Sequence, residues 1–406
     1  MIKKKYFIDL FAGCGGLSVG LEQAGFQPLL YNEINHSARE SYKNYIKARH
    51  EPEFINDVKS LNSELLESLQ NKWRVSGIKD IDLIAGGPPC WGYSRIGLRR
   101  TFDTDKKNIG TNHLYNYMAS VIKFVKPKMF LFENVHGLLS SRWTKNGEKG
   151  EIWKDVQTVF SNIEGYSINA EKVYCYNYGI PQNRPRIIIV GIRDDLDWKD
   201  EIGKPCGGRL PDIKTVDTPN IFDVLSDLID PQYRDTLKTD TYPSNPMTDI
   251  QTELRTSNGK IFKKGDKIYN HEYSNHTPRI IEKFKHMIEN DGEIPLNFKT
   301  KKFNQKILPS VWKNGNPNIT ITSLPDDFVH FKQPRSLSVR ECARLQTFPD
   351  DFIFYGPRHT GGRRRAGEPE NNFELRDIPQ YTQIGNAVPV KMAKLFGEHF
   401  NRIINN

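Results

Sequence analysis

Apolar and polar positions alternate in short blocks along the first half of the chain, and these blocks predict strands and helices in turn. Apolar runs bounded by lysine, glycine or proline predict strands at residues 6–11, 27–34, 54–58, 81–85, 128–135, 168–176 and 186–192. Apolar positions at helical spacing predict helices at residues 17–24, 37–49, 61–73, 114–125 and 152–163. Strict alternation of strand and helix indicates an α/β fold with a mostly parallel, doubly wound sheet.

The pattern becomes irregular after residue 192. From 193 to 333, short apolar runs are separated by many Pro, Asn, Asp and Thr residues, which predicts a second, smaller and irregular domain. Helical spacing returns at residues 337–348 and 390–403. We therefore divide the chain into residues 1–192, residues 193–333 and a C-terminal segment at 334–406. Within that segment, the glycine-rich and charged stretch 356–376 is predicted to be a mobile loop.

Composition narrows the class of protein. The chain has 406 residues and 37% hydrophobic residues, which is typical of a globular protein with two domains and a sizeable core. No apolar run approaches the length of a membrane span. The five cysteines form no C-x-x-C pair, which argues against a disulfide framework or structural zinc and favours a reducing, cytoplasmic compartment. The net charge of +9 suits a polyanionic partner such as nucleic acid.

The ends of the first three strands predict a nucleotide-like ligand site. In the motif DLFAGCGG, Gly13 and Gly15 allow a sharp turn and a close approach of the backbone to a ligand. Glu33 follows Gly13 by 20 residues, the usual distance to a carboxylate that binds ribose hydroxyls. A dinucleotide fingerprint would need a third glycine where Ser18 stands, and the pattern is more similar to the S-adenosylmethionine (SAM) site of class I methyltransferases. Asp57 would then face the adenine.

The motif GGPPCWGYS predicts the reacting end. It follows the strand at 81–85 and places Cys90 after two prolines, which fix the backbone there. An isolated cysteine beside a turn is more often a small buried residue. If the substrate is a pyrimidine such as cytosine, a different role follows, because C5 of the ring becomes nucleophilic once a thiolate adds at C6, and this addition needs an acid at N3. Glu133 closes the strand at 128–135, where burial would favour its protonated, donating form.

The chain resembles the cytosine-C5 DNA methyltransferases over nearly its whole length, because six motifs occur in that family's order. They are DLFAGCGGLS, GGPPCWGYS, FENV, QNRPR, RECARLQTFP and QIGNAVP. The resemblance implies a Rossmann-like, SAM-dependent catalytic domain at 1–192 and a target-recognition domain at 193–333. It also implies that segment 334–406 returns to the catalytic domain, where residues 383–389 are expected to form a turn at the ligand site. The expected activity is methyl transfer from SAM to C5 of a flipped-out cytosine in a specific sequence of double-stranded DNA.

The resemblance also implies individual roles. Cys90 would be the nucleophile, and Glu133 would contact N3 and the exocyclic amine. Arg186 would hold the cytosine O2, and Arg184 would support the site. The residues expected to bind SAM are Phe11, Gly13, Gly15, Glu33, Asp57, Pro89 and Asn386.

Two residues depart from the family pattern. Trp91 stands where glutamine is usual, and Tyr93 replaces a common phenylalanine. These changes leave the nucleophile in place but make the conformation of the expected mobile loop at 91–110 harder to predict. The insertion at 356–376 is also atypical and receives no function.

Other segments allow structural interpretations. Residues 270–285 could be a DNA groove element or an ordinary amphipathic helix that starts after Thr277. The helix at 337–348 is predicted to be structural, with Arg340 and Arg344 as internal ion-pair partners. His271 and His276 lack cysteine partners, so a metal site is not expected.

The physiological setting is inferred from the economy of the chain, which has no added regulatory domain. We expect the modification enzyme of a prokaryotic restriction–modification system, acting as a monomer on DNA in the cytoplasm. A partner nuclease would be related in function without forming a complex.

Alternative interpretations share parts of this pattern. A transfer-RNA cytosine-C5 methyltransferase would not need so large a domain at 193–333. Exocyclic-amine methyltransferases place an aromatic residue after Pro-Pro where this chain has Cys90. Zinc cytidine deaminases need P-C-x-x-C together with H-x-E, and Pro89-Cys90 is followed by WGY. A catalytically inactive DNA-binding protein would not need Cys90, Glu133 and the two arginines.

Overall fold

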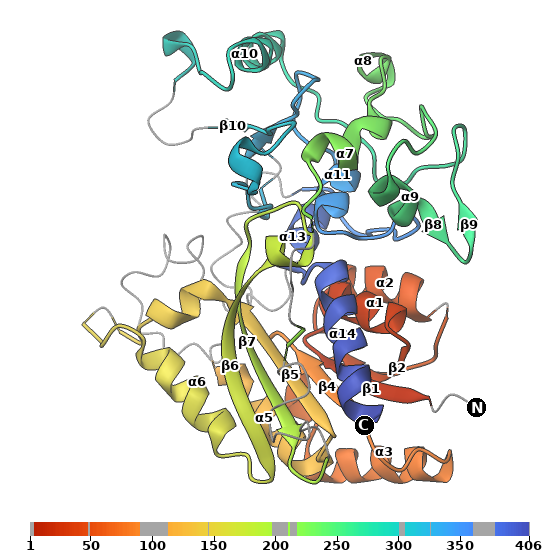
Figure 1. The fold of residues 1–406 in the computed structure, drawn as a ribbon, viewed down its shortest axis with the longest axis vertical. Coiled ribbons are helices and arrows are strands. Elements are labelled where there is room, and N and C mark those ends of the chain that lie inside the picture. Colours follow the sequence, from red (N-terminus) through yellow and green to blue (C-terminus); the bar gives the residue numbers. More distant parts are fainter. Residues whose placement is uncertain are drawn as a thin grey trace.

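Two lobes lie one above the other in the computed structural model, which describes residues 4–47, 49–89, 113–144, 146–196, 210–211, 217–299, 305–324, 326–359 and 378–405. The lower lobe is built on one sheet, and the upper lobe consists of short helices, small strands and loops (Figure 1). None of the helices in these ranges is long and apolar enough to cross a membrane.

Seven strands form the sheet of the lower lobe, in the order β3-β2-β1-β4-β5-β7-β6. They are β1 (Lys5–Leu10), β2 (Phe26–Asn32), β3 (Glu53–Ile55), β4 (Leu83–Gly86), β5 (Met129–Val135), β6 (Tyr166–Tyr174) and β7 (Pro185–Arg193). Neighbours from β3 to β5 are parallel, whereas β7 is antiparallel to β5 and β6. The predicted α/β fold with a mostly parallel sheet is confirmed. Chain order reverses between β1 and β4, so a ligand crevice is expected at the carboxyl ends of these strands.

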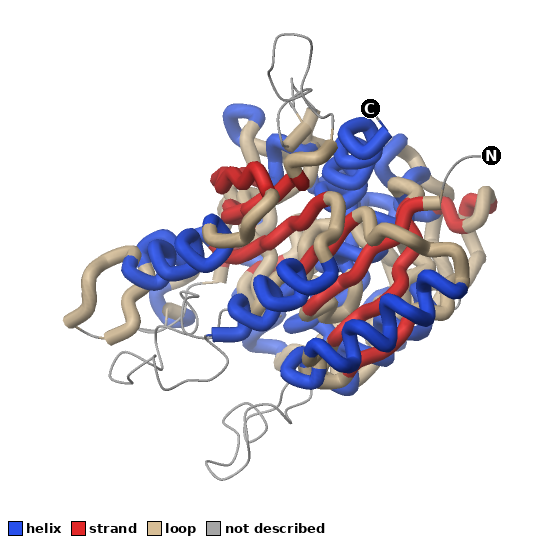
Figure 2. Tube along the Cα trace, turned by 90° about the horizontal axis from the view of Figure 1, so that it is seen from below, coloured by secondary structure: helices blue, strands red, loops and turns tan. Residues whose placement is uncertain are grey.

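Helices cover both faces of the sheet (Figure 2). They are α1 (Gly16–Gln23), α2 (His36–Tyr42) with a π-helical turn (Lys43–Lys47), α3 (Ser63–Val75), α5 (Leu114–Val125), α6 (Glu151–Ser161) and α14 (Val390–Asn405). Successive strand residues belong to opposite hydrophobic clusters, as the alternation of side chains requires. Met129 packs with residues of α1 and α14, and Phe130 packs with residues of α3, α5 and α6.

Glycines allow α1 and α14 to pack very closely, although α14 follows the whole upper lobe in sequence. A Cβ atom added at Gly20 would stand 2.5 Å from the Cβ of Ala393 and closer still to the carbonyl oxygen of Val390. A Cβ atom added at Gly397 would stand 2.6 Å from the Cβ of Ala24. Real side-chain atoms do not approach so closely, so glycine is required at both positions. The C-terminal helix is therefore part of the lower lobe.

The upper lobe has little regular structure. Its helices are α7 (Ile221–Leu225), α8 (Tyr233–Thr236), α9 (Asp249–Arg255), α10 (Pro278–Glu289), α11 (Val339–Leu345) and α13 (Gln380–Asn386). Its strands are β8 (Thr256–Ser257), β9 (Lys260–Ile261), β10 (Lys306–Ile307) and β11 (Phe328–Val329). Helix α10 starts at Pro278 as predicted and packs Phe284 and Met287 against Val329. It is thus an amphipathic helix, and a contact with DNA remains a prediction.

Several predicted boundaries were wrong. The strand expected at 54–58 ends at Ile55, and Asp57 instead caps a 3-10 turn (Val58–Ser60). The helix expected at 337–348 is the shorter α11, which starts after Ser338 with a capping box. The turn expected at 383–389 begins as the last part of α13. The predicted mobile loop at 91–110, which includes Trp91 and Tyr93, lies outside the described residues. The same is true of the predicted loop at 356–376 beyond residue 359.

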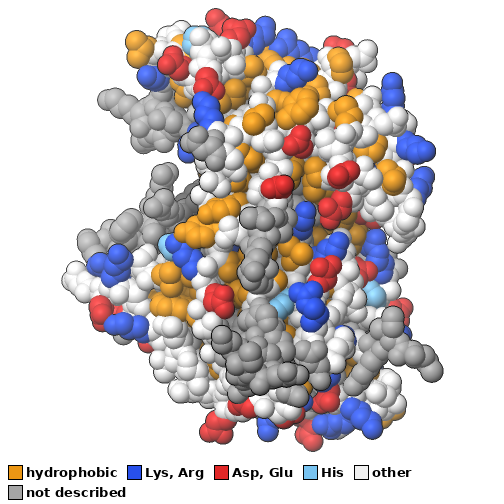
Figure 3. Space-filling model, in the orientation of Figure 1, with side chains coloured by type: hydrophobic (Ala, Val, Ile, Leu, Met, Phe, Trp, Pro, Cys, Tyr) orange, Lys and Arg blue, Asp and Glu red, His pale blue; other side chains and the backbone are white. Residues whose placement is uncertain are grey.

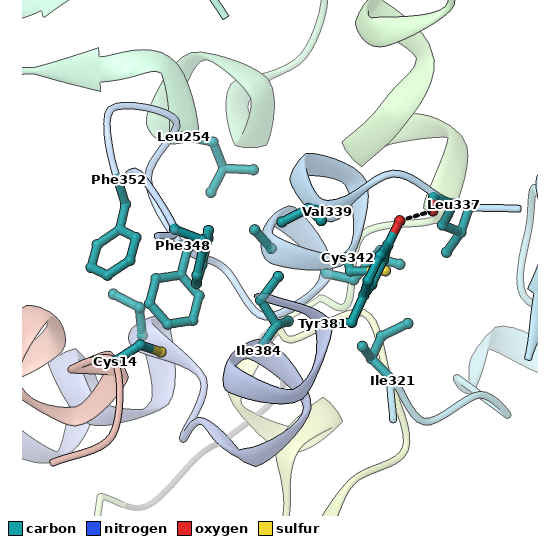
Figure 4. Close-up of a cluster of buried hydrophobic side chains, with 14 of the residues drawn as sticks. Cys14, Leu254, Ile321, Leu337, Val339, Cys342, Phe348, Phe352, Tyr381 and Ile384 are labelled. Atoms are coloured by element: carbon teal, nitrogen blue, oxygen red, sulfur yellow. Dashed lines mark hydrogen bonds between the residues drawn. The ribbon is translucent and has the colours of Figure 1, made fainter. Parts of the chain in front are cut away.

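The two lobes share a hydrophobic core, and a buried charge network lies beside it in the upper lobe. Figure 4 shows Cys14, from the turn before α1, beside Phe348 and near Ile384 of α13. Arg344 of α11 pairs with Asp350 at 2.6 Å and with Asp227 of the upper lobe at 2.5 Å. Arg340 lies 3.8 Å from Asp350 and donates to the backbone carbonyls of Pro349 and Phe352. The prediction that both arginines are internal ion-pair partners is confirmed.

Candidate active site

Glu33 lies directly beyond β2 and is buried. Its carboxylate accepts hydrogen bonds from the backbone N–H groups of Gly13, at 2.8 Å, and Asn35, at 2.7 Å. Burial raises the pKa of Glu33, and these two hydrogen bonds partly oppose the rise. Gly13 has a left-handed φ of 58°, and the space where a side chain would begin is open. A buried acceptor and an accessible stretch of backbone thus meet at the carboxyl ends of β1 and β2.

Asn32 brings the ends of the first three strands together. Its side-chain oxygen accepts from the N–H of Phe11 at 3.3 Å, and its amide donates to the carbonyl of Ile55 at 3.1 Å. Phe11 itself has a left-handed φ of 59°, which is uncommon for a residue with a side chain. Asp57 is half-buried and accepts from the N–H of Lys59 at 3.0 Å. The predicted ligand residues of three strands therefore line one edge of the sheet.

Asn386 reaches the same edge from the far end of the chain. It is the last residue of α13 and is exposed. Helix α13 is fixed to the lower lobe through Gln383, whose carbonyl oxygen lies 3.6 Å from Cys14 Sγ and whose side-chain oxygen accepts from Ser41 Oγ at 2.7 Å. The returning segment and the glycine turn are therefore directly bonded.

Glu133 and Arg186 form a buried pair at the ends of β5 and β7. Arg186 lies opposite Val135 in the antiparallel register, so Glu133, two residues earlier, is its diagonal neighbour on the same face. Arg186 Nε lies 2.5 Å from Glu133 Oε1, and the two side chains are 8% and 10% exposed. The contact lacks hydrogen-bond alignment, and neither of these two atoms has a hydrogen-bond partner among the described residues. Buried polar atoms of this kind mark a place where a polar ligand can bind.

The residues that precede Cys90 are held against this pair. Asn134 donates from its side-chain amide to the carbonyl of Pro88 at 3.1 Å. A Cβ atom added at Gly87 would stand 3.0 Å from Glu133 Oε2, so glycine allows the backbone to pass close to the carboxylate. Pro89 is half-buried, and Cys90, the next residue, lies outside the described residues.

Arg184 is buried and contacts backbone carbonyls. Its guanidinium donates to the carbonyls of Ile321 at 2.9 Å, Gly385 at 2.5 Å and Ala387 at 3.2 Å. Arg184 therefore ties the loop before β7 to α13 and to the upper lobe. The supporting role that was expected for it stays a prediction.

The three described cysteines are poorly suited to act as thiolates. Cys14, Cys175 and Cys342 are all buried. Burial raises the pKa of the Cys14 thiol to about 12 and that of Cys175 to about 11, even though Arg186 and Arg184 act to lower the latter. Burial also raises the pKa of Cys342. A nucleophilic thiol must be largely deprotonated, so none of these three fits that role.

The two histidines of segment 270–285 are engaged in hydrogen bonds. His271 is buried and contacts Ser338 Oγ at 2.7 Å and Tyr273 Oη at 3.0 Å, and burial lowers its pKa to about 4. His276 contacts Ser336 Oγ at 3.1 Å. Within the described ranges, no group of three or more His, Cys, Asp or Glu side chains is placed to hold a metal ion.

Two residues of the site were missed by sequence reasoning. Asn134 positions Pro88, and Gln182 is fully buried in the loop before β7. Both belong to motifs that were recognised, FENV and QNRPR, but only the structure shows what their amides bind. An amide side chain gives no signal of its partners in a single sequence.

Comparison with known proteins decides the family. A sequence model of the family described as C-5 cytosine-specific DNA methylase matches residues 6–402. The chain belongs to this family. It is therefore a DNA cytosine-C5 methyltransferase, and its sheet is that of a class I SAM-dependent methyltransferase.

Relatives of this DNA methyltransferase match along nearly the whole chain. The Type II methyltransferase M.DdeI of Desulfomicrobium norvegicum is 29% identical, over 98% of this chain and 89% of that protein. The Type II methyltransferase M1.HphI of Haemophilus parahaemolyticus is 27% identical, over 97% and 85%. The crystal structure of a DNA modification methyltransferase from an E. coli prophage shares the fold with a TM-score of 0.68 and 23% identity, over 99% of this chain and 100% of that one.

Proposed function

We propose that this DNA methyltransferase transfers the methyl group of SAM to a flipped-out cytosine through a covalent bond between Cys90 Sγ and C6 of the base. The observation that supports this most directly is the buried pair of Glu133 and Arg186, which stands beside the backbone that leads into Cys90. Its unbonded polar atoms match the donors and acceptors of a cytosine edge. Glu133 would contact N3 and the exocyclic amine, and Arg186 would donate to O2.

The chemistry follows from these placements. The Cys90 thiolate adds to C6 while Glu133 gives a proton to N3, so that the ring becomes an enamine that is nucleophilic at C5. SAM supplies the methyl group as a sulfonium. C5 forms the new carbon–carbon bond, and the carbon–sulfur bond of the donor breaks. Solvent then takes the C5 proton, which restores the C5–C6 double bond and expels the Cys90 thiolate, and N3 returns its proton to Glu133.

The residues at the ends of β1, β2 and β3 fit a nucleoside. Each oxygen of Glu33 accepts one backbone N–H, and a carboxylate oxygen can accept a second hydrogen bond, here from a ribose hydroxyl. We assign Asp57 to the adenine, and Phe11, Gly13, Gly15, Pro89 and Asn386 to the remaining wall of this SAM site.

We assign target recognition to residues 193–333 and propose that the enzyme acts on double-stranded DNA as a cytoplasmic monomer. Rotating a base out of the duplex costs a few kcal/mol of stacking, which contacts between the enzyme and DNA must offset. The described basic and acidic side chains are interspersed on the face drawn in Figure 3. Relatives named Type II methyltransferases support a modification role in a restriction–modification system, with a partner nuclease that is not bound.

The test is a covalent trap. DNA from cells that express the enzyme is first mapped by bisulfite sequencing, and the mapped sequence is then synthesised with 5-fluorocytosine at the target. Fluorine cannot leave C5 as a proton does, so a SAM-dependent, denaturant-stable adduct should form on Cys90. Cys90→Ser should form no adduct and transfer no methyl groups while still binding SAM. Normal turnover by Cys90→Ser would refute the mechanism.

A further inference from the structure

The side chain of Gln182 is fully buried where the two lobes meet. Its amide nitrogen donates to the carbonyl of Leu345 at 2.7 Å and to Gln346 Oε1 at 2.9 Å. Its amide oxygen accepts from the N–H of Ile321 at 3.2 Å. One side chain therefore joins the loop before β7 to the end of α11 and to segment 319–321.

Gln346 extends this connection towards the C-terminal helices. Its amide donates to the carbonyl of Ile384 in α13 at 2.8 Å, and its own backbone carbonyl accepts from the N–H of Val390 at 3.1 Å. Gln346 is also fully buried. Because an unmade hydrogen bond of a buried amide is costly, these segments can shift relative to one another only by breaking several bonds at once.

The same loop carries the predicted cytosine-binding arginine. Three residues separate Gln182 from Arg186, and Arg184 between them also bonds to Ile321. The backbone N–H of Asn183 donates to the carbonyl of Ile319 at 2.6 Å. Each of the residues 182–184 is thus hydrogen-bonded to segment 319–321. Arg186, which contacts Glu133, follows two residues later in the chain.

We propose that Gln182 is a positioning residue for methyl transfer, whose amide makes the placement of Arg186 depend on the seating of the upper lobe. This inference rests on the proposed function, because it takes Arg186 as the residue that holds the cytosine. When segment 319–321 and the end of α11 are packed against the loop before β7, the hydrogen bonds of Gln182 fix that loop. Arg186 then contacts the cytosine in the reactive geometry. Misplacing a reacting group by about 1 Å can cost roughly 10²-fold in rate.

The test compares two buried glutamines. Gln182→Met keeps the volume of the side chain but removes its hydrogen bonds. Gln251→Met is the matched control, because Gln251 is also fully buried, with bonds to Ser226 Oγ at 2.9 Å and from the N–H of Met247 at 2.7 Å, all inside the upper lobe. For each variant we would measure the melting temperature, the Kd for SAM, the Kd for the mapped duplex, and the single-turnover rate with both substrates saturating.

Both variants should melt earlier than the parent enzyme. Only Gln182→Met should lose single-turnover rate, by roughly 10²-fold, with an unchanged Kd for SAM, because α13 keeps its separate bonds to Cys14 and Ser41. Equal rates in the two variants, whether normal or reduced, would overturn the positioning role.

Arg186→Ala is measured in parallel and separates the two possible failures. If Arg186→Ala retains full activity, the proposed cytosine site itself is wrong. If Arg186→Ala loses activity while Gln182→Met keeps the parent rate, only the inference about Gln182 fails.

Discussion

The contact between Glu133 and Arg186 depends on the strands that carry the two residues. The two are 53 positions apart in the chain, and their contact is fixed by the register of β5 against β7. The sequence motifs were enough to identify both residues as candidates for the active site, because charged groups at the ends of apolar strands are recognisable. They could not show that one guanidinium nitrogen would face one carboxylate oxygen, since register depends on pairing across the sheet.

Asp9 allows a prediction at the same scale. It is buried at the end of β1 and accepts from Ser18 Oγ at 2.5 Å, and burial raises the pKa of its carboxyl from 3.8 to about 7. The folded protein therefore keeps a proton that the unfolded chain releases. The resulting stability is fully present below pH about 4 and is lost as the pH rises to about 7.

Asp9→Asn removes this titration and keeps an acceptor for Ser18. Relative to the variant, the parent should lose several kcal/mol of unfolding free energy between pH about 4 and about 7. Urea unfolding of both proteins at several pH values measures the difference. Parallel pH profiles for the two proteins would contradict the prediction.

Whole elements were predicted best where local signals agree with the fold. Helix α5 was predicted to the residue, because Lys126 adopts a left-handed conformation and Pro127 follows it. Edge strand β3 was overestimated, because it has only three residues and its end is set by pairing with β2. Helix α13 was taken for a turn, since its sequence QYTQIGN favours helix poorly. Contacts with the lower lobe, such as Ser41 with Gln383, stabilise it instead.

The contact between α1 and α14 can be tested with one methyl group. In Gly20→Ala the new Cβ would collide with the Cβ of Ala393 and with the backbone of Val390. Such overpacking costs about 1–3 kcal/mol, which outweighs the gain of about 1 kcal/mol in helix propensity. Chemical denaturation should therefore show a lower unfolding free energy. A variant as stable as the parent, or more stable, would show that the two helices can move apart freely.

At the scale of the molecule, the upper lobe is stabilised around fully buried charges. Asp227 forms ion pairs with both Arg344 and Arg255, each at 2.5 Å, and all three side chains are fully buried. Arg344 lies in α11, within the RECARLQTFP motif, and Arg255 is the last residue of α9. Sequence reasoning predicted that Arg344 would be paired, but Asp227 lies 117 positions away in a segment without a recognisable motif.

Asp227→Asn should be strongly destabilising, because it leaves two buried guanidinium groups without their shared counter-charge. Breaking a buried ion pair costs about 3–5 kcal/mol, and thermal unfolding would show the loss. Asp291→Asn is the control. Asp291 also pairs with a basic side chain, Lys313 at 2.6 Å, but the two side chains are 78% and 75% exposed. That change should cost no more than about 1 kcal/mol. Similar losses in the two variants would refute the importance of the buried network.

The position of α14 has a consequence during protein synthesis. This helix covers α1 on one face of the sheet, yet a ribosome makes it only after every residue of the upper lobe. The apolar face of the lower lobe that α14 covers therefore stays exposed to solvent while the ribosome synthesises the upper lobe. During that interval the unfinished enzyme exposes a surface that chaperones bind and that favours aggregation.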